Sequence, residues 1–186
     1  MKTKNFLLTG ALLIVALFSV NGVMAQSPAA KEGTTNVHIV LNPMQAITVN
    51  QTDVTLAYTS IDDYKDGVEK SVEGHLTVHS VGPFTVRVKA GSDFNYTGVD
   101  TNDAIPASHV QLTATASTGS LGVTPTVTLG KETTGTPLIT SSTRGGFNMK
   151  YDVNYSTKNT NGNAFQYAKH LGGTYTAVVT YEITSK

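Results

Sequence analysis

The stretch His75–Ala90, HLTVHSVGPFTVRVKA, carries the strongest local pattern in the chain. Apolar and polar side chains alternate in both of its halves, a period of two that is typical of half-buried β-strands. Gly82 and Pro83, between the halves, are residues that favour a turn. An antiparallel hairpin that places Ser80 opposite Phe84 would keep both apolar sets on one face. We therefore predict a hairpin whose inner face enters a hydrophobic core.

The other face of this hairpin would be basic. His75 would lie across from Lys89, and the nearby positive charge would lower the pKa of His75. This face is a candidate contact surface, as are two tyrosines in or beside predicted loops. The candidate surface residues are His75, His79, Arg87, Lys89, Tyr64 and Tyr96.

Similar alternation recurs on both sides of this stretch, and no segment shows helical periodicity over three turns. The additional predicted strands are 46–49, 54–58, 110–116, 123–129, 149–155 and 174–184. Threonine and valine are frequent, which favours strands over helices. Strands at these spacings predict an all-β fold, an immunoglobulin-like two-sheet antiparallel β-sandwich of about seven to eight strands.

The N-terminal residues have the pattern of a secretory leader. Lys2 and Lys4 precede an apolar run, and Val23-Met24-Ala25 forms a small-x-small ending. We predict a Sec signal peptide over 1–25, a flexible arm over 26–36 and one β-sandwich domain over 37–186. The protein would then be exported to the periplasm, the cell surface or the medium. The mature chain contains no second apolar run, so we expect no transmembrane anchor.

Val37, Ile39 and Leu41 form a short alternating set just after the predicted arm. Asn42-Pro43 interrupts this pattern, because proline has no N–H to donate to a sheet. We predict an edge-like assembly strand over 37–41. Such a strand can pair within its own sheet or with a neighbour's, and the residues leave both alternatives open.

The chain shows no pattern that is typical of catalysis. It has 13 basic and 13 acidic residues and no cysteine, which argues against nucleic-acid binding and excludes disulfides. We find no nucleophile, phosphate-loop or zinc-protease motif, and we predict no catalytic residue and no cofactor. His75 and His79 would lie about 13 Å apart on a strand, too far to share one metal ion.

An acidic stretch over 62–69 is the stronger of two candidates for a cation site; the weaker one, Asp100, Asn102 and Asp103, is explained by turn formation through Asx side chains. The stretch over 62–69 offers oxygen ligands of the kind that calcium prefers, from Asp62, Asp63, Asp66 and Glu69. The spacing does not fit an EF-hand loop, since Tyr64 and Lys65 occupy positions that ligands would need. We interpret the stretch as solvated loop charge, with calcium as the alternative.

Three stretches resemble a known group of proteins: 35–41, 75–86 and 173–181, the last reading GTYTAVVTY. They resemble the spore-coat-U-like and fimbrial (pilin-like) subunit group, which are small secreted β-sandwich proteins of Gram-negative bacteria. The resemblance implies an immunoglobulin-like sandwich, Sec export and a structural or adhesive role at the cell surface. It also implies self-association or binding to other surface proteins.

Two functions remain open at this point. The first is a non-enzymatic surface subunit that assembles by β-strand donation. The second is a monomeric binding module for polysaccharide or peptide, using the loop tyrosines and the basic face. Four further tyrosines alternate with aliphatic residues, and we expect most of them to pack in the core rather than stack on sugars. They are Tyr151, Tyr155, Tyr175 and Tyr181.

Overall fold

The structure, a computed structural model, describes residues 32–99, 102–117, 119–158 and 164–186. The predicted leader and the first part of the predicted arm, 26–31, lie outside the described residues. The chain divides into two units, 1–40 and 41–186. Within the first unit, the described residues 32–40 form no helix and no strand.

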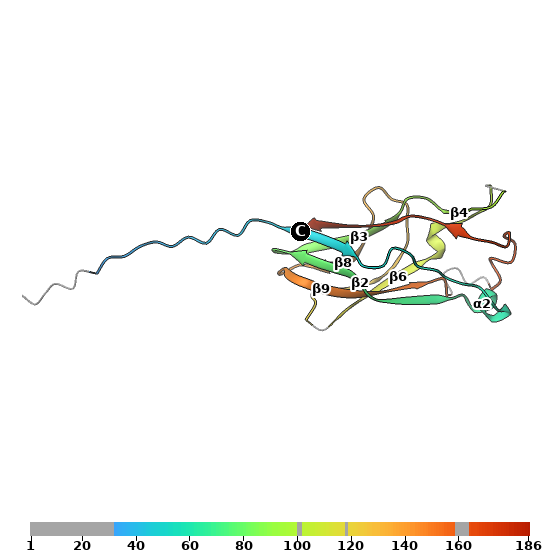
Figure 1. Cartoon of the computed structure of the whole chain (residues 1–186), viewed down its shortest axis with the longest axis horizontal. Coiled ribbons are helices and arrows are strands. Elements are labelled where there is room, and N and C mark those ends of the chain that lie inside the picture. Colours follow the sequence, from blue (N-terminus) through green and yellow to red (C-terminus); the bar gives the residue numbers. More distant parts are fainter. Residues whose placement is uncertain (1–31, 100–101, 118, 159–163) are drawn as a thin grey trace, which may run out of the picture. The chain divides into compact units, whose positions relative to one another are not determined.

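The second unit contains all the regular structure of the described residues (Figure 1). Its elements, in order, are β1 (Gln45–Val49), α2 (Ile61–Asp66), β2 (Glu69–Ser80), β3 (Phe84–Ala90), β4 (Phe94–Tyr96), β5 (Ala104–Ile105), a 3-10 turn (Ala107–His109), β6 (Gln111–Ala116), β7 (Thr126–Thr128), β8 (Thr136–Ser141), β9 (Gly146–Ser156), β10 (Tyr175–Thr176) and β11 (Val179–Ser185).

The predicted all-β sandwich is confirmed. A five-stranded sheet with the order β1-β2-β9-β6-β7 lies against a three-stranded sheet with the order β11-β3-β8 (Figure 1). A small third sheet, β10-β4-β5, lies beside them, and every strand pair is antiparallel. The strands exceed the predicted number because several are only two or three residues long.

The predicted hairpin over 75–90 is wrong. β2 pairs with β1 and β9, whereas β3 pairs with β11 and β8 in the other sheet. Residues 81–83 cross from one sheet to the other, and Gly82 adopts a positive φ of 92° there. A hairpin and a crossover both direct the two apolar sets into the same core, so the alternation does not distinguish them. Consequently His75 does not lie opposite Lys89.

A bulge in β2 explains a second difference, the orientation of His75. Val72 pairs with Val153 and Leu76 with Tyr151, so β2 has two more residues than β9 between these pairs. Gly74 has a φ of 55°, and its N–H donates to Asp152 Oδ1 at 2.6 Å. The bulge shifts the alternation, so His75 points inward beside Leu76 and is only 1% exposed.

Most of the predicted inward residues form the core between the two main sheets. Leu76, Val78, Phe84, Val86 and Val88 are fully buried. Two of the tyrosines expected in the core, Tyr151 and Tyr155, are buried as predicted, at 0% and 7% exposure. A third, Tyr181, packs against the core but remains partly exposed.

Other segments depart from the predicted strands. Residues 54–58 alternate as predicted but form no strand, and 174–184 is divided into β10 and β11. Only 126–128 of the segment 123–129 forms a strand, β7, while Val123 makes an isolated bridge to Thr140. β8 has no predicted counterpart.

Candidate assembly site: an open side of the sandwich

The two sides of the sandwich differ in how completely they are closed. On one side, β7 and β8 are the edge strands of the two main sheets. A pair of backbone hydrogen bonds between Val123 and Thr140, 2.8 and 3.0 Å long, joins the connection that precedes β7 to β8. Val127 is 8% exposed and Leu129 is fully buried. This side is therefore sealed by protein.

On the opposite side β1 and β11 also lie close to each other, but the apolar side chains there are less completely covered. Ile47 and Val49 lie on the same face of β1, yet Ile47 is only half-buried and Val49 is 37% exposed. Apolar residues along this margin pack against the core without being enclosed: Ile47, Val54, Leu56, Val179, Tyr181 and Ile183. We refer to this margin, with Val49, as the open side. Apolar surface of this kind favours contact with a further apolar element.

β11 offers free backbone groups along the open side. The Gly91 N–H donates to the Val178 carbonyl at 2.8 Å, so Val178 and every second residue after it point their backbone groups toward β3. Alternate residues of an antiparallel strand point their backbone groups to opposite edges. The N–H and C=O groups of Val179, Tyr181 and Ile183 therefore face away from β3. No backbone hydrogen bond joins these three residues to another described residue on that edge.

Residues 53–59 cross between β1 and α2 without joining either main sheet. Val54, Leu56 and Tyr58 are half-buried and alternate with exposed residues, as in a strand. Their backbone nevertheless makes no hydrogen bond to the backbone of another described residue. A segment with the side-chain pattern of a strand and no ladder indicates that this margin lacks a pairing partner.

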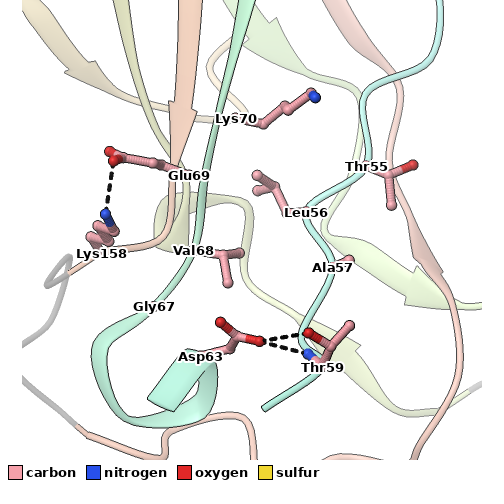
Figure 2. Close-up of a pocket in the computed structure, with 10 residues that line it drawn as sticks. All are labelled: Thr55, Leu56, Ala57, Thr59, Asp63, Gly67, Val68, Glu69, Lys70 and Lys158. Carbon is pink, nitrogen blue, oxygen red and sulfur yellow. Dashed lines mark hydrogen bonds and ion pairs between the residues drawn. The ribbon is translucent and has the colours of Figure 1, made fainter. Parts of the chain in front are cut away.

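Figure 2 shows a hollow between this segment and the start of β2. It has a volume of about 460 Å³ and is lined by Thr55, Leu56, Ala57, Thr59, Asp63, Gly67, Val68, Glu69, Lys70 and Lys158. The Thr157 N–H donates to the Val68 carbonyl at 2.9 Å, so the backbone groups of Val68 point toward β9. Those of the next residue, Glu69, therefore point the other way, toward the hollow. This hollow separates residues 55–59 from the start of β2.

A polar bridge crosses the core behind β11. His75 Nε2 lies 2.8 Å from the Tyr155 hydroxyl, which is also hydrogen-bonded to the Tyr181 hydroxyl. The His75 ring meets both tyrosine rings edge-on, with centroids 5.6 and 5.7 Å apart. Burial lowers the pKa of His75. We predicted this direction, but the cause is burial and not Lys89.

The predicted assembly strand forms no strand in its own chain. Residues 37–44 have neither strand nor turn, and Val37, Ile39 and Leu41 are 81%, 83% and 76% exposed. Of the two alternatives left open, pairing within its own sheet is not seen in this structure. Its three alternating apolar side chains remain uncovered, since Asn42-Pro43 separates them from β1 and its ladder.

The predicted basic face is not assembled. Arg87 Nη1 donates to the Gly135 carbonyl at 3.1 Å, and Lys89 Nζ donates to the Thr133 carbonyl at 2.7 Å. Both cations therefore hold the connection between β7 and β8. His79 belongs to the other sheet, where its Nδ1 accepts from the Asn148 N–H at 3.1 Å. With His75 buried, these four side chains do not form one surface.

Two of the four acidic residues predicted as candidate calcium ligands, Asp63 and Glu69, have other partners. Asp63 closes the N-terminus of α2, accepting from the backbone N–H groups of Thr59 and Ser60 at 2.7 Å each. Glu69 forms an ion pair with Lys158 at 2.7 Å (Figure 2). Asp62 and Asp66 lie on α2. Within the described ranges, no three His, Cys, Asp or Glu side chains are grouped to hold a metal ion.

Tyr64 and Tyr96, predicted in or beside loops, lie on α2 and β4 and belong to a chain of ring contacts at the α2 end of the sandwich. Successive centroids lie 5.2 to 6.2 Å apart through Tyr64, Tyr58, Tyr167, His170, Tyr175 and Tyr96. Tyr64 is 36% exposed, so part of its surface remains available. The rings contact each other rather than presenting one flat platform.

Asp103, predicted as a turn residue, connects several segments at this end. Its carboxylate accepts from the Tyr175 hydroxyl at 2.6 Å and from the Leu171 N–H at 2.8 Å, and lies 2.5 Å from His170 Nδ1. The hydrogen bond from Tyr175, followed by those from Leu171 and His170, lowers the pKa of Asp103 to about 2. Partners this distant in sequence leave no local signal.

Comparison with known proteins adds no assignment. No protein-family model matches the chain, and no curated protein matches it. In the part of the chain that the structure describes, no helix is both long and apolar enough to cross a bilayer. The family resemblance of the three stretches stays a prediction.

Proposed function

We propose that the protein is a non-enzymatic, exported structural or adhesive surface subunit that assembles by strand donation. Residues 37–41 of one copy would pair with the free edge of β11 in a second copy. The observation that carries the proposal is the open side, where β11 has free backbone groups and half-buried apolar side chains. An edge of this kind is a template for an added strand. The predicted leader supports export.

The spacing of the donated segment matches that of the edge. Val37, Ile39 and Leu41 repeat every second residue, as do the three inward residues of β11. Burying an aliphatic side chain of this size contributes roughly 1.5–3 kcal/mol, so three offer roughly 5–9 kcal/mol before the cost of ordering the segment. Main-chain hydrogen bonds along the edge would add to this and fix the register.

Two adjacent residues of the segment provide a matched test. Ile39 would point into the neighbour and Val40 away from it, yet the two are equally uncovered, at 83% and 78% exposure. We expect oligomers of the purified protein in light scattering and negative-stain microscopy. Ile39→Asp should abolish them, because it would bury a carboxylate, and Val40→Asp should retain them. A monomeric parent protein, or equal loss in both variants, would contradict strand donation.

A further inference from the structure

We propose that His75 makes strand capture at the open side sensitive to acid. The inference rests on the proposed function, since it concerns regulation of the same site. His75 would act through Tyr155 and Tyr181, so that its protonation loosens the edge that receives the donated strand.

The geometry connects the two sheets through the core. His75 lies on β2 and Tyr155 on β9, both in the five-stranded sheet, whereas Tyr181 lies on β11 in the other sheet. Their hydroxyls and the His75 Nε2 form one hydrogen-bonded chain. Tyr181 is also one of the three residues whose backbone faces the open side. The state of His75 is therefore linked directly to the receiving strand.

Protonation would strain this bridge whichever ring nitrogen carries the proton of neutral His75. With that proton on Nε2, protonation adds an N–H at Nδ1, which is buried without a hydrogen-bond partner. With that proton on Nδ1, protonation turns Nε2 from an acceptor into a donor, so Tyr155 must accept from it and donate to Tyr181. The Tyr181 hydroxyl proton would then have to find an acceptor other than Tyr155. Either change weakens the link between His75 and β11.

Among the described residues, no neighbouring charge offsets the cost of protonation. The ionisable side chains that face the ring are Tyr155 on β9 and Tyr181 on β11, both phenols whose pKa burial raises. From the segment after β1, Asn50 contributes only a backbone N–H, to the His75 carbonyl at 2.8 Å. The Asp152 carboxylate is bound to the Gly74 N–H at the bulge. Burial alone shifts the pKa of His75, downward from 6.5.

The sign of the pH dependence follows from linkage. Below pH 6.5 the unfolded chain binds a proton that folded His75 resists, so stability falls as pH decreases toward the folded pKa. A donated strand would cover the open side and lower this pKa further. Affinity for the strand should then fall with decreasing pH, about tenfold for each unit by which capture lowers the pKa.

The first experiment follows assembly from pH 7.5 to 5 by light scattering. The parent protein should dissociate as the pH falls, and His75→Gln should lose this pH dependence. His79→Gln is the matched control, a histidine on the same strand outside the bridge, and it should behave like the parent. Loss of the pH dependence in His79→Gln, or its retention in His75→Gln, would overturn the inference.

A second experiment needs neither assembly nor a variant. Histidine NMR signals of the dilute monomer give the pKa of His75, and hydrogen exchange gives the protection of the Thr180 and Glu182 amides, which pair with β3. We expect a pKa below 6.5 and protection that decreases as His75 titrates. A His75 pKa of 6.5 or above would refute the acid response. So would amide protection that stays constant while His75 titrates. If the monomer responds as expected but never assembles, strand donation fails and the acid response of β11 stands.

Discussion

Truncating two valines to alanine, one in the core and one on β11, tests whether the β11 side of the sandwich is open. Val86 on β3 is fully buried, whereas Val179 on β11 is only partly buried. Val86→Ala deletes two carbons, worth about 0.8 kcal/mol each, and leaves a cavity, so we expect a loss of about 2–3 kcal/mol. Val179→Ala deletes the same atoms from a half-open site that can relax, so the loss should be about 1 kcal/mol or less.

Urea unfolding followed by far-ultraviolet circular dichroism gives both values, at concentrations where light scattering shows a monomer. Both substitutions delete the same atoms from strands of one sheet, β3 at its centre and β11 at its edge. In the assembled protein the donated strand would bury Val179, and its truncation should cost about 1 kcal/mol more, roughly a fivefold loss of affinity. Equal destabilisation of the two monomers would refute an open side.

The remaining predictions concern the ends of the sandwich. Because the pKa of Asp103 is lowered to about 2, its contribution to stability is complete above pH 4 and disappears as pH falls toward 2. Urea midpoints of Asp103→Asn should lie below those of the parent at pH 6 and converge with them at pH 2. Gly145→Ala would place a Cβ 2.0 Å from the Ser80 carbonyl oxygen, whereas at Gly172 nothing lies within 4 Å. Thermal melts should show a loss of about 1–3 kcal/mol or more for Gly145→Ala and little change for Gly172→Ala.

The alternation of apolar residues predicted the fold class and much of the core. Leu76, Val78, Phe84 and Val86 point inward as their spacing indicates. The pattern could not assign strands to sheets, since β2 and β3 present the same inward faces whether they form a hairpin or cross between layers. Sheet assignment depends on pairing with β9 and β11, which are distant in the chain.

Features that depend on distant partners were inaccessible to sequence reasoning. The bulge at Gly74 reverses the orientation of His75, and a lone glycine within a strand pattern was its one local sign. The alternation of Val37, Ile39 and Leu41 and their isolation by Asn42-Pro43 predict the segment that we propose is donated. The edge proposed to receive it could not be predicted, because whether a strand lies at the margin of a sheet is not encoded locally.

Cysteine cross-linking between two copies tests strand donation most directly, since the chain contains no cysteine of its own. One preparation would carry Ile39→Cys. It would be mixed, in separate reactions, with copies that carry Ile183→Cys or Thr184→Cys. The side chain at 183 faces the core margin, and the side chain at 184 faces the other way. Tyr181→Cys and Thr180→Cys form a second such pair.

Strand donation predicts a disulfide-linked dimer of the two preparations under mild oxidation with an inward position, Ile183→Cys or Tyr181→Cys. The outward position of each pair should give far less, since adjacent side chains on paired strands share a face. Equal cross-linking at inward and outward positions, or none at any of the four, would contradict the pairing of residues 37–41 with β11 of a second copy.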